Sequence, residues 1–129
     1  MNNYFALAGL LAFLVGLVHS VLGERLVFSR MRKTGWIPTN GGPVLQERHV
    51  RILWASWHLV TVFGWVIAIL LLRLSLPSSP AAARTVIVPV AIAGLLASSL
   101  LVLIGTNGKH PGWIGLLGVA ILTALGASR

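Results

Sequence analysis

The sequence predicts an all-α fold: a polytopic integral membrane protein built as an antiparallel bundle of four transmembrane helices. Hydrophobic residues make up 57% and charged residues only 9% of the 129 residues, whereas soluble domains carry about a quarter charged residues. The chain contains four apolar runs close to the roughly 20 residues that a helix needs to cross a bilayer. No run alternates like the strands of a membrane barrel, so helices are the expected spanning elements.

The four expected helices cover residues 4–23, 52–72, 85–105 and 111–127 of a single membrane domain, 1–129. The first run has no basic start and no small-residue cleavage site, so we expect a mature helix rather than a signal peptide. Pro89 is expected to open the third helix near its first turn or to kink it. The Pro/Ser segment 75–80 and the Asn107-Gly108 pair are typical of turns, so consecutive helices should run antiparallel.

The charge balance predicts the partner and the orientation. Ten Lys and Arg face only Glu24 and Glu47, but the cations lie between apolar runs, so membrane phospholipid is the expected partner and nucleic acid is not. Loop 24–51 and the loop with Lys109 hold seven Lys and Arg, whereas the other side holds Arg73, Arg84 and Arg129. The basic loop 24–51 is therefore expected in the cytoplasm, with both termini outside.

Two further surface patterns suggest contacts. Four cations after the first helix alternate with apolar residues, which is typical of an interfacial segment that contacts anionic headgroups; they are Arg25, Arg30, Arg32 and Lys33. Small residues recur along three helices, at Ala8, Ala12, Gly16 and Ser20, at Ala91, Gly94, Ser98 and Gly105, and at Gly112, Gly115 and Gly118. Such stripes allow close helix approach, either within the bundle or toward a second copy or a larger membrane complex.

A candidate site lies where the first two helices meet the basic loop. His19 is about one and a half turns inside the end of the first helix, and His58 about two turns inside the start of the second. Because an ionised group inside a membrane costs roughly 2.5–3.5 kcal/mol, it normally has a partner in the bundle. We therefore expect His19 and His58 to approach each other, with Glu24 and Arg51 at the cytoplasmic mouth of the same cavity.

Three interpretations of this cavity stay open. Neutral histidines can hydrogen-bond across the helices and only stabilise them. His19 and His58 can instead ligate a b-type haem or a metal ion, since antiparallel helices present two imidazoles at one depth. In the third, Glu24 and the histidines form the relay of a small proton-coupled transporter. The cofactor is otherwise unknown, and the absence of Cys excludes thiolate sites.

No enzyme signature names a reaction, since the sequence lacks a phosphate loop, a His-Glu-x-x-His motif and an evident Ser, His and acid set. The expected function is therefore that of a small inner-membrane binding or accessory protein, able to self-associate. Its motifs, Gly16-Leu17-Val18-His19-Ser20-Val21-Leu22-Gly23-Glu24, Trp57-His58 and His110-Pro111-Gly112-Trp113, make the chain similar to a group of small, uncharacterised bacterial four-helix membrane proteins. That resemblance implies the bacterial inner membrane and transfers no functional residue.

Overall fold

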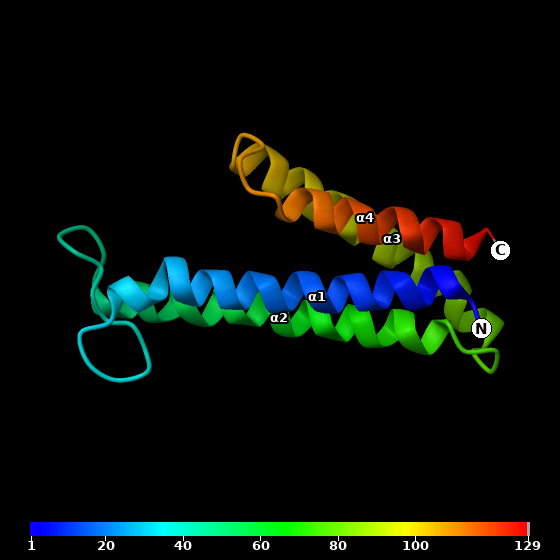
Figure 1. The fold of residues 1–129 in the computed structure, drawn as a ribbon, viewed down its shortest axis with the longest axis horizontal. Helices are drawn as coiled ribbons and strands as arrows, with labels where there is room; N and C mark the ends of the chain where they lie inside the picture. The colour runs from blue at the N-terminus through cyan, green and yellow to red at the C-terminus, as the bar shows by residue number, and fades with distance from the viewer. Residues whose placement is uncertain (129) are drawn as a thin grey trace. The chain divides into compact units, whose positions relative to one another are not determined.

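The computed structural model describes residues 1–128, and over these residues the chain forms four α-helices and one short 3-10 helix (Figure 1). Their bounds are α1 Asn3–Leu26, η1 Phe28–Met31, α2 Glu47–Leu74, α3 Ala81–Gly105 and α4 Gly112–Ala127. The prediction of an all-α chain with four helices is confirmed. Three of them, counting η1 with α1, are long and apolar enough to cross a membrane, whereas α4 is shorter. Arg129, counted in the charge balance, lies outside the described residues.

The helices begin and end in more polar sequence than the apolar runs predict. Helix α1 continues to Leu26 instead of ending at residue 23, α2 begins at Glu47 instead of residue 52, and α3 begins at Ala81 instead of residue 85. Charged residues end an apolar run, but several of them are good helix formers. In α2 the Arg51 Nε donates to Glu47 Oε1 at 2.8 Å, a pairing one turn apart that supports the added turn. The segment without helix is therefore 32–46, shorter than the predicted loop 24–51.

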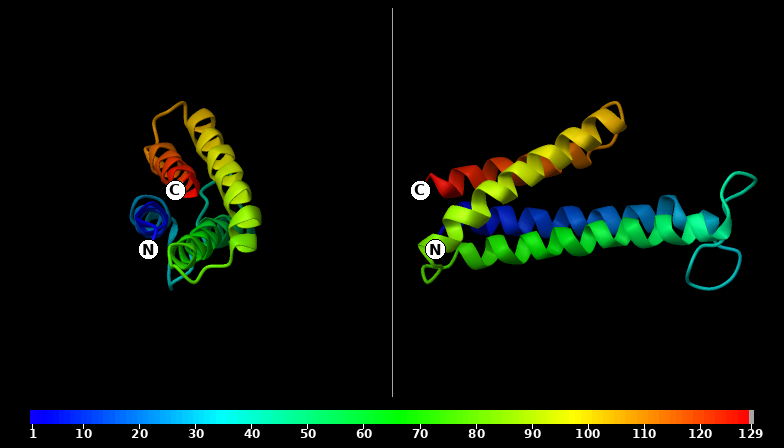
Figure 2. Two further views of the ribbon diagram at one scale, coloured as in Figure 1. Left: turned by 90° about the vertical axis from the view of Figure 1, so that its right-hand side faces the viewer. Right: turned by 180° about the vertical axis from the view of Figure 1, so that it is seen from behind.

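The connections on either side of α3 follow the residues that predict turns. Pro80 precedes α3 in an extended conformation, and the helix continues through Pro89 instead of opening there. After α3, Asn107 and Gly108 have φ of 50° and 72°. Asn and Gly adopt this left-handed conformation at the least cost, which allows a tight connection. Figure 2 shows α3 and α4 joined there as a helical hairpin.

Contacts divide the chain into two compact units. The loop unit is Gly16–Phe63, and the hairpin unit is Met1–Val15 together with Gly64–Arg129. The hairpin unit has an apolar core, in which Phe5, Ala8, Leu71 and Val119 are fully buried. The loop unit has a different interior, since its helix segments meet through polar side chains.

Small residues bring the helices of the hairpin unit together. A Cβ on Gly115 of α4 would lie 2.7 Å from Val15 Cγ2 of α1, and one on Gly126 would lie 2.8 Å from the Phe5 ring. Such distances are shorter than van der Waals contact, so only glycine fits. On α1 itself, Ala8 and Ala12 are buried in the core. The small-residue stripes of α1 and α4 therefore serve packing within the chain.

Candidate functional site

A row of polar side chains lies between α1 and α2 in the loop unit. The Ser20 Oγ lies 2.8 Å from His58 Nδ1 and donates to Thr61 Oγ1 at 2.9 Å. The Thr61 hydroxyl in turn donates to the carbonyl oxygen of Gly16 at 3.3 Å, and Thr61 is buried. We call these residues, together with Glu24, the polar row.

Helical spacing explains why these residues meet. On α1, Gly16, Ser20 and Glu24 recur every fourth residue, so they share one face. On α2, His58 and Thr61 are three residues apart and share a face in the same way. Gly16 pairs with Thr61 and Ser20 with His58, so the two segments run in opposite directions within this unit.

The Glu24 carboxylate ends the polar row beside the loop. Its Oε1 forms an ion pair with Arg32 Nη1, and its Oε2 accepts a hydrogen bond of 3.2 Å from Trp54 Nε1. The same Oε2 lies 3.6 Å from His58 Nε2, and the side chains of Glu24 and His58 are 32% and 28% exposed. The carboxylate is thus held by a cation and an indole while it faces an imidazole.

Hydrogen counting assigns the role of one His58 nitrogen, Nδ1. A hydroxyl carries one hydrogen, and Thr61 uses its hydrogen on Gly16 while Ser20 uses its hydrogen on Thr61. Ser20 Oγ must then accept from His58, so Nδ1 carries a hydrogen. The other nitrogen, Nε2, lies 3.6 Å from the Glu24 carboxylate and makes no hydrogen bond to the described residues.

His19 has a different partner, Trp57. The two rings are stacked with centroids 4.4 Å apart and planes 6° apart, and Trp57 Nε1 donates to the His19 carbonyl oxygen at 3.1 Å. The buried Phe28 ring meets the Trp57 ring edge-on, at 5.7 Å between centroids. Gly23 makes room for the indole, since a Cβ there would overlap it. This aromatic cluster lies on a second face of the same helix pair.

The structure brings some of the predicted site residues together and separates others. Glu24 and His58 meet at the end of the polar row. His19 stacks on Trp57, and successive residues on a helix diverge by about 100°, so Trp57 and His58 present different faces. Arg51 pairs with Glu47 at the surface of α2. Within residues 1–128 no three His, Asp or Glu side chains gather as metal ligands, and haem or metal ligation by His19 and His58 stays a prediction.

Sequence reasoning missed three contributors to the site. Trp54 and Trp57 were not among the predicted site residues, but their indole N–H groups donate to α1. Trp54 lies one turn before His58 and Trp57 one residue before it. This spacing could have predicted that both indoles lie near the site. Arg32 was expected to contact lipid, whereas it pairs with Glu24 and its Nε donates to the Trp36 carbonyl oxygen at 2.7 Å. No spacing rule predicts that contact, because the chain leaves the helix before Arg32 returns to it.

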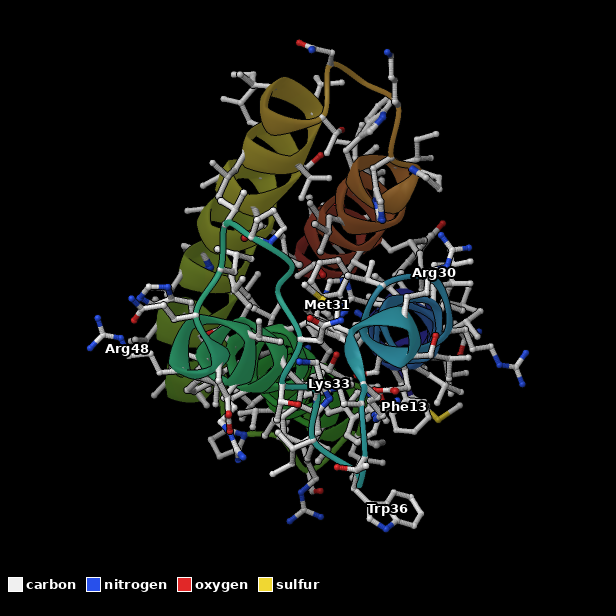
Figure 3. All side chains as sticks on the ribbon, turned by 90° about the vertical axis from the view of Figure 1, so that its left-hand side faces the viewer. Phe13, Arg30, Met31, Lys33, Trp36 and Arg48 are labelled. Atoms are coloured by element: carbon white, nitrogen blue, oxygen red, sulfur yellow. The ribbon has the colours of Figure 1, made fainter. Side chains whose placement is uncertain are left out.

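Helix η1 and the loop after it expose cations and apolar side chains. Arg30 and Lys33 are exposed, Trp36 is 90% exposed and Val44 is 83% exposed. Figure 3 shows the Trp36 indole projecting away from the helices, with Arg30 and Lys33 labelled on the same loop end. An exposed indole beside cations is typical of a segment at a membrane–water interface.

Chemically, the polar row joins α1 to α2 through a chain of hydrogen bonds that ends beside the Glu24 carboxylate. A comparison of the chain with protein-family models, with curated proteins and with solved structures found no match. The functional interpretation therefore depends on the geometry of the chain itself.

Proposed function

We propose that this chain is a bacterial inner-membrane protein whose helices form an antiparallel transmembrane bundle, and that it acts as a binding or accessory protein. The support comes from its surface. Large apolar side chains are exposed along the three long helices, as at Leu10, Phe63, Val90 and Leu101, which are 58%, 63%, 69% and 73% exposed. Soluble monomers rarely expose contiguous apolar surface of this kind, whereas hydrocarbon solvates it without cost.

The cytoplasmic loop of this proposal is 32–46 with the helix ends beside it. Its cations and the exposed Trp36 suit the headgroup region of an anionic leaflet, with Arg25, Arg30 and Lys33 toward the lipid. Both termini then lie outside. Fusing a periplasm-active and, separately, a cytoplasm-active reporter to the C-terminus tests the orientation. We expect activity from the periplasmic reporter alone, and cytoplasmic activity would contradict the orientation or the number of crossings.

The length of the polar row favours binding over transport. From Glu24 to Gly16 the row covers about 12 Å of α1, at roughly 1.5 Å per residue, whereas the hydrocarbon core is about 30 Å thick. Beyond it, residues 5–15 of α1 carry no polar side chain, and residues 62–72 of α2 carry only the Trp65 indole. A relay through these two helices would therefore stop less than halfway across. Polar side chains confined to one end of the two helices suit a binding protein better than a transporter.

The binding face of the proposal is the small-residue stripe of α3. Gly94 and Ser98 are exposed one turn apart, and a Cβ built on Gly94 meets no described atom within 4 Å beyond its own helix backbone. Ala91, the first residue of the stripe, is buried, but Gly94, Ser98 and Gly105 are exposed. Small residues four apart let a second helix approach closely in a membrane. The single observation that carries the proposal is the exposure of Gly94 and Ser98 on α3.

Gly94→Leu tests the binding face without disturbing the monomer, since nothing described lies where the new side chain begins. We expect the variant to lose dimers or larger complexes in cross-linking and native gels in mild detergent. Gly64→Leu on α2 is the matched control, because a Cβ there also meets nothing within 4 Å of the described structure. If wild type is monomeric, or if both variants assemble like wild type, α3 is not a binding face.

A further inference from the structure

A depression in the hairpin unit, apart from the polar row, contains a fixed cation. It has a volume of about 350 Å³, and its walls include Asn3, Tyr4, Ser75 and Arg84. These residues come from the start of α1, the end of α2 and the first turn of α3. Pockets that hold small ligands in proteins begin at roughly this size.

The Arg84 side chain is held in place by three contacts. Its Nη2 donates to the Leu74 carbonyl oxygen at 3.0 Å and its Nε donates to Ser79 Oγ at 2.9 Å. The guanidinium carbon also lies 5.6 Å from the centre of the Phe5 ring. A guanidinium has five N–H groups, so three of them have no hydrogen-bond acceptor among the described residues. The Arg84 guanidinium is therefore held in place with free N–H donors that can bind an external acceptor.

No carboxylate side chain of this unit can neutralise Arg84. The sequence contains no Asp, and its only acids, Glu24 and Glu47, belong to the loop unit, Gly16–Phe63. The two protein acceptors of Arg84 are a carbonyl and a hydroxyl, which carry no full charge. A cation in a partly enclosed pocket with uncharged partners attracts an anion from outside the chain.

We propose that this depression binds a phosphate group through Arg84, with the side-chain amide of Asn3 as a further donor. The planar guanidinium fork matches two phosphate oxygens at once, which an ammonium does not. The pocket lies at the ends of α1, α2 and α3, the level at which the phosphates of a bilayer lie if these helices cross it. The phosphate can thus belong to a lipid headgroup or to a free ion, and the bound chemistry is the same.

The only tyrosine of the sequence, Tyr4, lines this pocket and can serve as a spectroscopic probe of binding. Protein labelled with 3-fluorotyrosine and purified in a maltoside detergent, which contains no phosphate, gives a single ¹⁹F resonance. One arm titrates inorganic phosphate, and the other titrates short-chain phosphatidylglycerol at a low mole fraction. We expect a saturable shift. Saturation by the lipid where inorganic phosphate has no effect assigns the ligand to a headgroup, and the reverse assigns it to the free ion.

Variants separate binding from folding. Arg84→Gln should weaken the apparent affinity by roughly tenfold or more, because it removes charged hydrogen bonds. Arg73→Gln is the matched control, since Arg73 is an exposed cation at the end of α2 outside this pocket and its loss should leave the affinity unchanged. If Arg84→Gln fails to fold, Asn3→Ala replaces it as the test. This variant leaves the contacts of Arg84 intact and should also weaken binding. Absence of a saturable shift in wild type, or equal affinities of the Arg84 and Arg73 variants, overturns the proposal.

Discussion

Gly23→Ala tests how tightly α1 meets α2 in the loop unit. Gly23 is buried against the Trp57 indole, and an added Cβ would overlap three ring atoms, of which the farthest, Cδ1, is 2.8 Å away. The indole cannot move without cost, because it is stacked on His19, donates to the His19 carbonyl oxygen and meets Phe28 edge-on. The added methyl group must therefore separate the helices or displace the ring.

The expected loss of stability follows from these contacts. Forcing one extra carbon into a packed interior costs about 1–3 kcal/mol, and loss of the Trp57 hydrogen bond adds about 1 kcal/mol. Replacing a helical glycine by alanine returns about 0.5–1 kcal/mol. The net free energy of unfolding should fall by about 1–3.5 kcal/mol. At Gly64 an added Cβ meets nothing described within 4 Å. Gly64→Ala therefore keeps only the gain from replacing a helical glycine by alanine and should raise the free energy of unfolding slightly.

Reversible unfolding in mixed micelles, with increasing dodecyl sulfate in a maltoside detergent, measures both variants by circular dichroism. The two alanine substitutions should shift the midpoint in opposite directions. Helix propensity changes in the same way at both sites, so the difference between them isolates the contact with Trp57. If Gly23→Ala is as stable as Gly64→Ala, the indole yields freely, and the aromatic cluster does not hold α1 against α2.

Two further substitutions examine the polar row by the same assay. Thr61→Val removes the donor to Gly16 and the acceptor of Ser20 inside a buried contact, so it should lower the free energy of unfolding by about 1–3 kcal/mol. Thr61→Ser keeps the hydroxyl and should recover most of that loss. Equal losses in the two variants would mean that packing, not hydrogen bonding, matters at this position. Glu24→Gln leaves Arg32 without its counter-charge and should cost about 1–2 kcal/mol after allowance for its exposure. Glu47→Gln, in an exposed pair, should change stability by less than about 0.5 kcal/mol, and similar losses for both Gln variants would contradict the structural role of Glu24.

The sequence predicts that the four helices exist, but it does not predict where each helix begins and ends. Apolar runs predict the four helices because burial or lipid contact requires continuous apolar sequence in each. They do not predict the ends, since residues such as Glu47 and Arg51 are polar yet form helix through their own pairing. The division into a loop unit and a hairpin unit was not predicted. The division depends on which helix faces contact each other, because one unit has a polar interior and the other an apolar one. The composition of a single helix does not predict which faces meet.

The site shows the same limit in three dimensions. Depth along the helices can be counted from sequence, and in the structure Glu24 and His58 lie 3.6 Å apart between α1 and α2. Rotation cannot be counted in that way, because one residue turns a helix by about 100°. His19 consequently meets Trp57, one residue before His58. The Arg32 contact with Glu24 depends on the path of the chain through η1, which no helical periodicity describes.

The tight connection between α3 and α4 has a consequence for biogenesis. Helix α4 has 16 residues, which extend about 24 Å, less than the roughly 30 Å of hydrocarbon. Four glycines, at 112, 115, 118 and 126, further reduce the apolar surface that it offers to lipid. The Asn107-Gly108 turn follows α3 directly, so α3 and α4 leave the ribosome almost together. For the proposed transmembrane bundle, we therefore expect α4 to insert into the bilayer only together with α3.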